Sequence, residues 1–517
     1  MREGYGDGNV LNDARLIAPR RIGSTVAPMM RAMTMLRAPA LFLALVAAAP
    51  APAEAQTLQQ RVEAKLSEAG PGTRFGLVVA TEDGRELVAM APDSRFIPGS
   101  NTKMFTTAAA FATLSGLDAP DTAGGAAVRL EGGASGAPDV VLEGRGDARL
   151  SSRPDCVRNC LVALADAVSA RTRTVGDVIG DDSLFPDQRW SPGMSWNNIA
   201  TRSGTATSAL SLDDNELPLR VVPTKAGEPP SLEMLDYYEV DNRAVTVAAG
   251  PTELSFDRLP GSRLVRLEGR IAAGAEPGLL RLGIDDPADY SAWRLAALLE
   301  ERGVRVTGRI AVRHRPLRPV DDPEVRKGAP APRPPEEEVL ARLVPPPLAE
   351  DLAAINKKSQ NLHSELLLRR VGRKEGSGSL ADGLAAVHAM LAEAGVARSG
   401  YDVSDGSGMS TYNRIAPRAM VHFLRWAAAR PWGPAWRATL PVGGVDGTLD
   451  DRFRGTALEG RVFAKTGTLN ASNALSGFMT ARSGRTLIFS AFANDVPGGG
   501  GATGSLDAAL ALVAEAN

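Results

Sequence analysis

Cysteine and histidine are scarce in this sequence of 517 residues. It contains two cysteines and four histidines. The histidines are scattered and form no His-Glu-x-x-His pattern, which supplies two zinc ligands from one helix face in metallopeptidases. They are His314, His363, His388 and His422. Two cysteines alone do not make a zinc site. We therefore expect neither a metal nor another cofactor, and a metallohydrolase is disfavoured.

The cysteine pair also leaves a question about redox state. Cys156 and Cys160 stand four residues apart in the sequence. In an oxidising compartment such a pair can form a disulfide, and two buried free thiols fit the sequence equally well. The sequence leaves both alternatives open.

The sequence also lacks a strong net charge and a long hydrophobic run. A formal net charge of −2 gives no reason to expect a polyanionic partner, so nucleic-acid binding is not expected. The apolar run Ala38–Ala49 is shorter than the ~20 residues that a membrane-spanning helix needs. It follows Arg31 and Arg37 and precedes Ala53-Glu54-Ala55, the order typical of a secretory signal peptide. We predict a signal peptide and upstream segment over residues 1–55, export to the periplasm or cell envelope, and at most peripheral membrane contact.

The remaining chain, from about Gln56, is long enough for two or three domains at about 150 residues each. Its first part predicts a helix, a hairpin that turns at Asp83-Gly84, and a second helix, at 57–69, 75–80 with 86–90, and 100–114. Its last part predicts three strands and a closing helix, at 461–469, 474–481, 486–493 and 505–515. Further helices are predicted at 348–358, 362–371, 381–394 and 418–429.

A long middle region differs in composition and in its predicted secondary structure. From about residue 124 it is rich in glycine, aspartate and short strand-like runs, and clear helices are predicted only at 156–169 and 290–302. A stretch rich in proline and charge, 315–347, indicates a linker or surface excursion. We predict one discontinuous domain from 56–123 and 345–517, an antiparallel sheet covered by helices. The region 124–344 is then a β-rich insertion, of two subdomains, with its linker.

The first motif whose residues could take part in catalysis is Ser100-Asn101-Thr102-Lys103, which follows Pro98-Gly99. At a helix start, residues i and i+3 share a face, so the Lys103 amine can reach the Ser100 hydroxyl. A neutral lysine can remove the hydroxyl proton and make the serine a nucleophile. The helix N-terminus also aims free backbone N–H groups at developing negative charge. Taken alone, the pattern is more often a helix cap with a surface lysine.

The second motif, Ser359-Gln360-Asn361, lies in the break between two predicted helices. A hydroxyl and a carboxamide on a short loop can relay a proton to a leaving amine and hold a substrate amide. Taken alone, serine and asparagine at this place more often cap a helix. Ser195-Trp196-Asn197 has the same spacing, but it lies in a loop rich in proline and glycine, so Ser359 is preferred.

The third motif, Lys465-Thr466-Gly467-Thr468, ends a predicted strand. Lys465 adds positive potential, and Gly467 lets a ligand backbone approach the strand closely. The hydroxyls of Thr466 and Thr468 can bind a terminal carboxylate. Taken alone, this lysine is more often an exposed strand residue before a bend, and Lys225-Ala226-Gly227 is a rival motif in a loop.

The order of the three motifs is more informative than any one of them. Ser-x-x-Lys, then Ser-x-Asn, then Lys-Thr-Gly is the order found in penicillin-binding proteins and serine β-lactamases. The chain resembles the low-molecular-mass class C penicillin-binding proteins, the D-alanyl-D-alanine carboxypeptidase/endopeptidase family. The stretches that carry the resemblance are 98–103, 208–215, 356–367, 405–410, and 443–449 with 465–468. No Gly-x-Ser-x-Gly elbow is present, which disfavours an α/β-hydrolase.

The resemblance implies an α/β (α+β) fold. Its core is a discontinuous penicillin-binding/β-lactamase-like transpeptidase domain, in which helices flank an antiparallel five-stranded sheet, and it carries a large β-rich insertion. Peptidoglycan stem peptides are then the substrate, and β-lactam antibiotics are covalent inhibitors. A serine β-lactamase and a non-catalytic envelope protein that binds wall peptides are the two other hypotheses. The long insertion disfavours the first, and the intact nucleophile and base disfavour the second.

The resemblance also implies roles for the first two motifs. Ser100 attacks the carbonyl of a D-Ala-D-Ala or D-Ala–diamino-acid bond, and Lys103 takes its proton. Ser359 helps to protonate the leaving amine, and Asn361 holds the acyl part. Gln360 departs from the family, which more often has aspartate there, but the middle residue is not credited with chemistry.

For the third motif, the resemblance implies roles in the positive charge of the site and in substrate binding. Lys465 keeps the site electropositive, while Thr466 and Thr468 bind the substrate carboxylate. Gly467 belongs to the same substrate-binding strand. The backbone N–H groups of Ser100 and Thr468 form the oxyanion hole.

Lys103 can act as a base only in an unusual environment, because lysine in water has a pKa near ~10.4. Burial and a second cation nearby, Lys465, would favour its neutral form. His363, one helical turn past Ser359, is expected to be a helix-surface or packing residue rather than a base.

Two polar stretches are left with structural or functional alternatives. Asp213-Asp214-Asn215 marks either an insertion loop that faces the cleft or a solvated turn. Residues 405–410 are expected to form a tight turn rather than to carry a second nucleophile.

Overall fold

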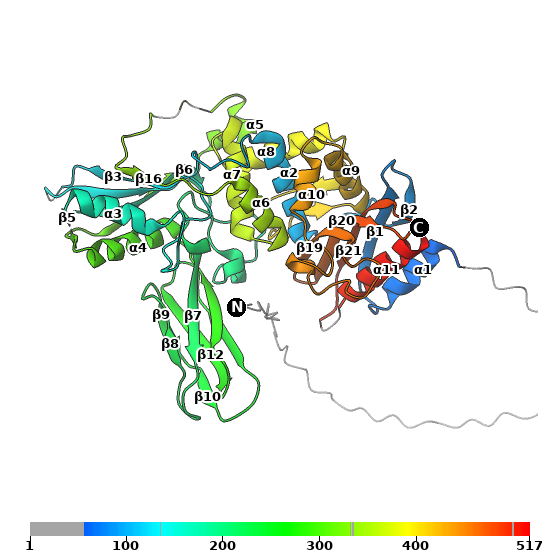
Figure 1. Ribbon diagram of the computed structural model, residues 1–517, viewed down its shortest axis with the longest axis horizontal. Helices are drawn as coiled ribbons and strands as arrows, with labels where there is room; N and C mark the ends of the chain where they lie inside the picture. The colour runs from blue at the N-terminus through cyan, green and yellow to red at the C-terminus, as the bar shows by residue number, and fades with distance from the viewer. Residues whose placement is uncertain (1–55, 135, 331, 333–334, 499–500) are drawn as a thin grey trace, which may run out of the picture. The chain divides into compact units, whose positions relative to one another are not determined.

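The computed structural model describes residues 56–517, apart from residues 135, 331, 333–334 and 499–500. The predicted signal peptide and its upstream segment lie outside the described residues. Gln56–Asn517 form one compact unit (Figure 1). Within the described part of the chain, no helix is both long and hydrophobic enough to cross a lipid bilayer.

Both ends of this unit contribute to one five-stranded antiparallel sheet. The first part supplies β1 (Arg74–Thr81) and β2 (Glu86–Met90), and the last part supplies β19 (Val462–Leu469), β20 (Ser472–Thr480) and β21 (Thr486–Asn494). The strand order is β19-β20-β21-β1-β2. The two ends of the chain are joined in this sheet because β1 pairs with β21, the last strand of the chain. The expected α+β fold with an antiparallel sheet of five strands is confirmed.

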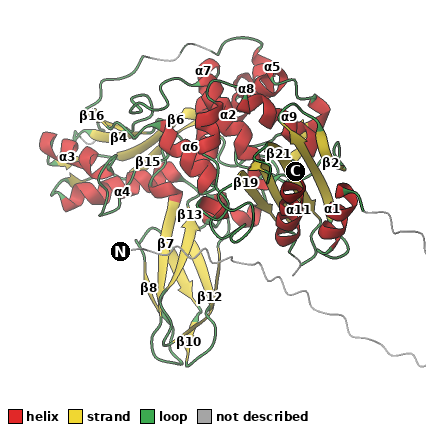
Figure 2. Ribbon diagram, turned by 45° about the vertical axis from the view of Figure 1, so that its right-hand side comes forward, coloured by secondary structure: helices red, strands yellow, loops and turns green. Residues whose placement is uncertain are grey.

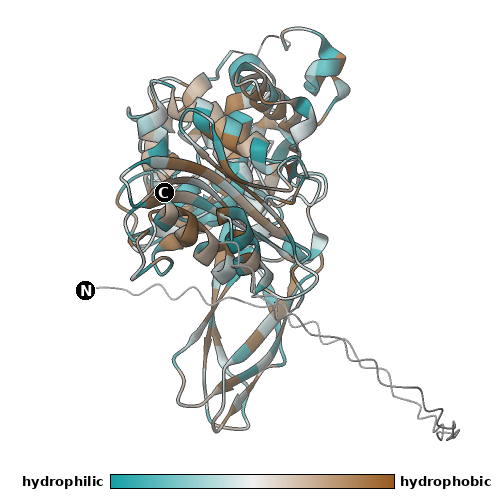
Figure 3. Ribbon diagram, turned by 90° about the vertical axis from the view of Figure 1, so that its right-hand side faces the viewer, coloured by the Kyte–Doolittle hydropathy of each residue, from teal (hydrophilic) through white to brown (hydrophobic). Residues whose placement is uncertain are grey.

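Helices cover both faces of this sheet, as Figure 2 shows. Successive residues of a strand point to opposite faces. Leu77 and Val79 of β1 accordingly enter a core with α1 (Leu58–Ser67) and α11 (Thr503–Ala516). Val78 and Ala80 enter the other core with α2 (Lys103–Thr113) and α9 (Pro417–Ala428). Hydrophobic stretches run along the strands and helices of these layers (Figure 3).

The helix that follows Ser100 is surrounded by other helices. α2 contacts α6 (Leu348–Lys357), α7 (Asn361–Glu375) and α8 (Leu380–Glu393). Its residues from Lys103 to Ala110 are buried, as expected for a helix that is covered on every side. This packing fixes the start of α2, where the first motif lies.

A second large sheet lies in the middle of the chain. Its strand order is β15-β6-β4-β3-β16 and it mixes parallel and antiparallel pairs. The strands are β3 (Ala127–Glu131), β4 (Asp139–Glu143), β6 (Val178–Asp187), β15 (Ile310–Pro316) and β16 (Ala341–Arg342). Helices α3 (Leu161–Arg171) and α4 (Pro287–Glu301) share its hydrophobic core.

A lobe of shorter strands projects from this region (green in Figure 1). Its strands are β7 (Glu216–Val222), β8 (Ser231–Glu233), β9 (Glu239–Asn242), β10 (Val245–Val247), β11 (Glu253–Asp257), β12 (Leu264–Ala272) and β13 (Gly278–Gly283). The remaining short elements are β5 (Thr174–Val175), β14 (Arg305–Val306), α5 (Pro323–Arg326), β17 (Tyr401–Asp402), β18 (Arg414–Ile415) and α10 (Gly433–Ala438). The middle of the chain is thus rich in β structure, and its exact division into domains stays a prediction. We call residues 124–344 the insertion below.

Two helices begin at other residues than the sequence indicated. α3 begins at Leu161, not near Cys156, because a disulfide joins Cys156 to Cys160 and Asn159 has a positive φ of 61°. α4 begins at Pro287, earlier than expected, because the Asp286 side chain accepts a hydrogen bond from the Asp289 N–H and caps it. The disulfide resolves the question that the sequence left open.

Candidate active site

Ser100 lies in a single 3-10 turn, Gly99–Thr102, that leads into α2. The α-helix itself begins at Lys103, three residues later than the sequence predicted. The turn packs against the backbone of β19, since a Cβ on Gly99 would lie 3.0 Å from the Thr468 nitrogen. The Asn101 side chain donates a 2.9 Å hydrogen bond to the Lys465 carbonyl. The first and third motifs are therefore in direct contact.

Gly467 permits this contact. A Cβ at Gly467 would lie 2.3 Å from the Pro98 carbonyl oxygen, a distance that would force the backbone apart. The sequence suggested that this glycine admits a ligand backbone. In the structure the chain's own turn makes the close approach, and ligand contact at Gly467 stays a prediction.

The Lys103 amine is fully buried between three oxygen atoms. It donates hydrogen bonds to the Ser100 Oγ at 2.8 Å, to the Asn361 Oδ1 at 2.7 Å and to the Ser407 carbonyl at 2.6 Å. None of these three oxygens belongs to a carboxylate. The first motif is therefore joined to the second through the lysine amine.

The insertion also reaches this cluster. Asn361 is the first residue of α7, and its Nδ2 donates a 2.9 Å hydrogen bond to the carbonyl of Ser203. One end of the carboxamide thus faces Lys103 and the other end faces the insertion. This contact fixes which way the amide points.

Lys465 and Ser359 form the other half of the cluster. Ser359 lies between α6 and α7 with a positive φ of 59°, and its Oγ accepts a 3.0 Å hydrogen bond from the Lys465 Nζ. The amine of Lys465 is fully buried and also donates to the Thr466 carbonyl at 3.0 Å. Like Lys103, it touches neutral oxygen atoms only.

The two threonines of the third motif differ in their surroundings. The Thr466 hydroxyl lies 2.7 Å from the hydroxyl of Thr448, which comes from a short 3-10 turn beside β19. Thr468 is exposed. β19 is an edge strand of its sheet, and the backbone of an edge strand can pair with an extended peptide.

Two buried carboxylates hold the loop that binds Lys103. Glu365 of α7 accepts hydrogen bonds from the backbone N–H groups of Gly406 and Ser407 at 2.9 and 2.8 Å. Asp405 accepts from the N–H groups of Gly408 and Ser410 at 2.9 and 2.6 Å. Residues 405–410 therefore form a tight turn, as expected, and this turn presents the Ser407 carbonyl to the lysine.

The electrostatics of the site follow from burial. Burial lowers the pKa of Lys103 to about 7, although the charges of Asp405 and Glu365 act in the opposite direction. Burial, followed by the charge of Lys103, lowers the pKa of Lys465 well below its usual value. Mutual repulsion disfavours the state in which both amines are charged. One of the two can therefore be neutral near pH 7.

The rival motifs are not part of this cluster. Ser195 directly precedes a short 3-10 turn, Trp196–Asn198, of the insertion, and Lys225 is exposed in the projecting lobe beyond β7. Among the described residues, neither forms a hydrogen bond with Ser100 or Lys103. The structure thus brings together Ser100, Lys103, Ser359, Asn361 and Lys465, with Thr466 adjoining them.

His363 is not a surface residue, and its polar contacts are with carboxylates and not with the Lys103 amine. It is buried, and its ring nitrogens lie 2.8 Å from the Asp214 Oδ1 and 3.2 Å from the Asp351 Oδ1. These bonds raise the pKa of His363 to about 9 against the effect of burial. Of the two alternatives expected for His363, helix surface or packing, the structure shows packing, and the contacts are ionic.

The turn 213–215 is mostly buried and not simply solvated. Asp213, Asp214 and Asn215 all have positive φ values, of 51°, 60° and 50°, a conformation that aspartate and asparagine tolerate better than other non-glycine residues. Hydroxyls of Ser151 and Ser152 donate to Asp213 at 2.6 Å each. The turn faces α7 through the Asp214–His363 bond.

Sequence reasoning did not identify four of these contributors: Ser203, Glu365, Ser407 and Thr448. Ser203 and Ser407 act through backbone carbonyls, which carry no signal in residue type. Glu365 directly precedes the run Leu366–Leu368, and an acidic residue beside buried leucines could have marked it. Among the described residues, no group of three or more His, Cys, Asp or Glu side chains could hold a metal ion.

The chain matches a protein family along nearly all of the described residues. Residues 58–514 match the D-Ala-D-Ala carboxypeptidase 3 (S13) family. The chain is 34% identical over 499 residues to a D-alanyl-D-alanine carboxypeptidase of Actinomadura sp. (strain R39), covering 92% of this chain and 88% of that protein. It is 24% identical over 450 residues to the D-alanyl-D-alanine carboxypeptidase DacB of Haemophilus influenzae, covering 84% and 87%.

Solved structures show the same fold. Penicillin binding protein 4 (dacB) from Haemophilus influenzae superposes with a TM-score of 0.70 at 21% identity, over 84% of this chain and 93% of that one. The same protein in complex with a β-lactam superposes with a TM-score of 0.63 at 20% identity over the same shares.

Proposed function

The chain belongs to the D-Ala-D-Ala carboxypeptidase 3 (S13) family, and from this we propose that it is a serine-type D-alanyl-D-alanine carboxypeptidase/endopeptidase. It cuts peptidoglycan stem peptides through an acyl-enzyme on Ser100 and is acylated by penicillins. The family agrees with the one that the three motifs indicated.

One observation carries the proposal. The Ser100 hydroxyl lies 2.8 Å from the buried Lys103 amine, whose pKa is lowered to about 7 by burial. A serine needs a base to become a nucleophile, and a base is most effective when its pKa lies near the working pH. The pair meets both requirements.

Acylation then proceeds with the following atoms. The Lys103 Nζ takes the proton of the Ser100 hydroxyl while the Oγ attacks the carbonyl carbon of the penultimate D-alanine. The backbone N–H groups of Ser100 and Thr468 stabilise the oxyanion, and the packing of the Gly99 turn on β19 supports this role. Asn361 keeps the lysine amine in place and binds the acyl part.

Release of the amine uses the second half of the cluster. The peptide C–N bond breaks, and the proton that Lys103 took from Ser100 passes to the departing nitrogen through the Ser359 hydroxyl, which Lys465 holds by a 3.0 Å hydrogen bond. Water, deprotonated by Lys103, later attacks the ester carbon and restores the Ser100 hydroxyl. The proton balance returns both amines to their starting state.

Recognition of the substrate's terminal carboxylate falls to β19. Thr466 and Thr468 donate hydroxyl hydrogen bonds, and Lys465 supplies positive charge when it is protonated. A bound carboxylate favours the charged form of a nearby lysine, so substrate binding raises the pKa of Lys465. Repulsion from Lys465 then keeps Lys103 neutral, as its role as a base requires.

We place the enzyme outside the cytoplasm, in the periplasm or cell envelope. The predicted signal peptide over residues 1–55 is one reason. The Cys156–Cys160 disulfide is a second, because disulfides persist in oxidising compartments and are rare in the cytosol.

Labelling with fluorescent penicillin tests the proposal. We expect a stable adduct on the purified chain, located at Ser100 by mass spectrometry of its peptides, and none on the Ser100→Ala variant. The matched control is Ser359→Ala, which keeps the nucleophile and base and should label more slowly. Rapid turnover of the penicillin would instead indicate a serine β-lactamase, and absence of label would indicate a non-catalytic binder of wall peptides.

A second measurement addresses the natural reaction. Release of D-alanine from a soluble stem pentapeptide, and loss of cross-linked dimers from digested peptidoglycan, separate carboxypeptidase from endopeptidase action. Both should vanish in Ser100→Ala.

A further inference from the structure

A cavity of about 320 Å³ lies on the insertion, outside the cluster around Ser100. Arg149, Arg153, Arg158, Asp213 and Asp214 line it on the insertion side, and Pro346, just before α6, lines it on the other. Its volume is at the lower end of the ~300–1,000 Å³ typical of small-ligand sites. None of these residues has a part in the catalytic proposal above.

Two of the three arginines have free hydrogen-bonding capacity. Arg149 already binds two carboxylates, Asp351 through its Nε at 2.6 Å and Glu350 through its Nη1 at 2.5 Å. Within the described part of the chain, neither the guanidinium of Arg153 nor that of Arg158 forms a hydrogen bond. The nearest carboxylate oxygen to Arg153 is the Asp213 Oδ1, at 3.6 Å, and the nearest to Arg158 is the Glu350 Oε1, also at 3.6 Å.

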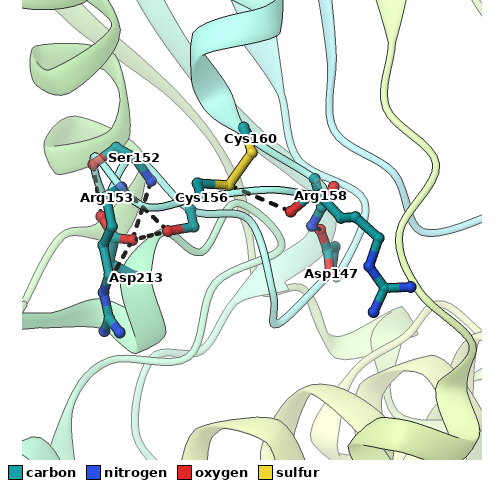
Figure 4. Close-up of a disulfide and its surroundings, with 9 residues drawn as sticks. Asp147, Ser152, Arg153, Cys156, Arg158, Cys160 and Asp213 are labelled. Atoms are coloured by element: carbon teal, nitrogen blue, oxygen red, sulfur yellow. Dashed lines mark hydrogen bonds and ion pairs between the residues drawn. A yellow bond between two sulfur atoms is a disulfide. The ribbon is translucent and has the colours of Figure 1, made fainter. Parts of the chain in front are cut away.

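The aspartates nearby do not satisfy Arg153, because other groups already bind them. Both oxygens of Asp213 accept hydrogen bonds, from Ser151 and Ser152. The Oδ1 of Asp214 is bound to His363, and its Oδ2 lies 3.9 Å from Arg153. Figure 4 shows Asp213 between Ser152 and Arg153, and Arg158 on the other side of the disulfide loop.

The disulfide keeps the two arginines in place. Arg153 lies three residues before Cys156 and Arg158 two residues after it, so the closed loop 156–160 fixes the chain between them. Asn159, in the same loop, donates a 2.5 Å hydrogen bond to the buried Asp147. The backbone that carries the two guanidinium groups is thus constrained before an oxyanion binds, which lowers the ordering cost of binding.

Arginine binds carboxylates and phosphates through paired N–H groups. Asp213 and Asp214 place negative charge in the same wall, which opposes a doubly charged phosphate more than a singly charged carboxylate. The cavity also adjoins the start of α6 and, through Asp214 and His363, α7, which begins at Asn361. A ligand here would therefore be held close to the helix that carries Asn361.

We propose that this cavity binds the free carboxylate of a second peptidoglycan stem peptide while another is being cut. The proposal rests on the proposed function for the nature of its ligand. Arg153 and Arg158 bind the carboxylate, and the disulfide loop positions them. We call the cavity the second-peptide site.

Calorimetric titration of the full chain tests the site. The probe is N-acetylmuramoyl tripeptide, which lacks both D-alanines and cannot be cut, and the same compound with an amide in place of its C-terminal carboxylate. The protein is the Ser100→Ala variant, so that the measurement does not depend on acylation. We expect the acid to bind at least tenfold more tightly than the amide.

Two further variants, both built on Ser100→Ala, locate the binding. Arg153→Gln with Arg158→Gln should weaken binding of the acid at least tenfold and leave binding of the amide unchanged. Arg171→Gln, an exposed arginine at the end of α3, is the matched control and should change neither. Equal thermal unfolding midpoints would show that the variants are folded.

The two possible failures are distinguishable. Equal binding of acid and amide, no effect of the double substitution, or equally strong competition by inorganic phosphate would overturn the second-peptide site. Failure of penicillin to label Ser100 would overturn the proposed function, and the titration of Ser100→Ala would still decide whether the cavity binds the tripeptide.

Discussion

Two buried bases, Lys103 and His363, have opposite electrostatics. Lys103 binds the Asn361 side chain, and His363 follows Asn361 by two residues on α7. The lysine touches neutral oxygens only, and its pKa is lowered to about 7. The histidine lies between two carboxylates, and its pKa is raised to about 9. Burial is similar for the two, so the identity of the contacting oxygens decides which base can exchange a proton near pH 7.

The difference separates a reactive group from a structural one. Removing a charge from water disfavours the charged form unless a counter-ion replaces the lost hydration. Asp214 and Asp351 do so for His363, which therefore ties the insertion and α6 to α7. Lys103 has carboxylates nearby, Asp405 and Glu365, but they bind backbone N–H groups of the turn 405–410 and leave the amine without a direct counter-ion.

Removing the reactive base should have the largest effect. Lys103→Met keeps the length and apolar body of the side chain but removes the amine, and general-base catalysis contributes about 10²–10⁴-fold. We expect the rate of acylation by fluorescent penicillin to fall by about that factor. Lys374→Met, at the exposed end of α7, is the control. An unchanged rate in Lys103→Met would show that another group activates Ser100.

Removing the structural base should affect stability more than chemistry. His363→Leu removes the buried imidazole from Asp214 and from the buried Asp351, and breaking a buried ion pair typically costs about 3–5 kcal/mol. We expect a loss of that size in the free energy of unfolding, measured by urea denaturation. His422→Leu, an exposed position on α9, should lose little. A stable His363→Leu protein would mean that Arg153 replaces the imidazolium.

The contribution of His363 should also depend on pH. Its pKa is raised from 6.5 to about 9 in the folded protein, so its stabilisation is complete below pH 6.5 and is lost as the pH rises through 9. The shift corresponds to roughly 3 kcal/mol. The stability difference between the native sequence and His363→Gln should therefore shrink by about that amount between pH 6.5 and 9.5. A difference that stays constant would contradict a charged imidazole.

The smallest effect is expected from giving the reactive base a counter-ion. In Asn361→Asp, a carboxylate replaces the amide oxygen 2.7 Å from the Lys103 amine, and an adjacent opposite charge raises a lysine pKa. Acylation should then fall about 5- to 50-fold at pH 7 and recover as the pH rises. Stopped-flow measurement of acylation between pH 6 and 10 checks this shift.

The control for that substitution is Asn361→Ala. It removes the same hydrogen bonds without adding charge, so the rate should fall with the midpoint of the pH profile unmoved. Identical profiles for the two variants would mean that the loss of the Ser203 contact, and not the charge, causes the defect.

Local spacing predicted part of this site and long-range contacts determined the rest. Ser100 and Lys103 are three residues apart, so a helical turn alone brings them together. The order of the three motifs indicated the family and, through it, the sheet of five strands. The carbonyl of Ser203 binds Asn361, and the carbonyl of Ser407 binds Lys103. Such contacts could not be predicted, because every residue type has a backbone carbonyl.

The ionic role of His363 illustrates the same limit. The sequence left position 363 as either a surface or a packing residue, and the group that covers it comes from the insertion, at Asp214. The sequence of a helix can indicate which of its faces is buried, but it does not indicate which residues pack against that face. The late start of α3 has a similar cause, because the disulfide that closes 156–160 competes with the helical periodicity of the segment.

The strand order has a consequence for how the protein is made. β1 is among the first strands to be synthesised, and its partner β21 is the last, with Leu77 opposite Ala491. Until the C-terminus emerges, one edge of the β1–β2 hairpin exposes unpaired backbone groups and hydrophobic side chains, a condition that favours aggregation. A chain truncated before β21 would keep all three motifs but lack the strand that joins the β1–β2 hairpin to β19 and β20.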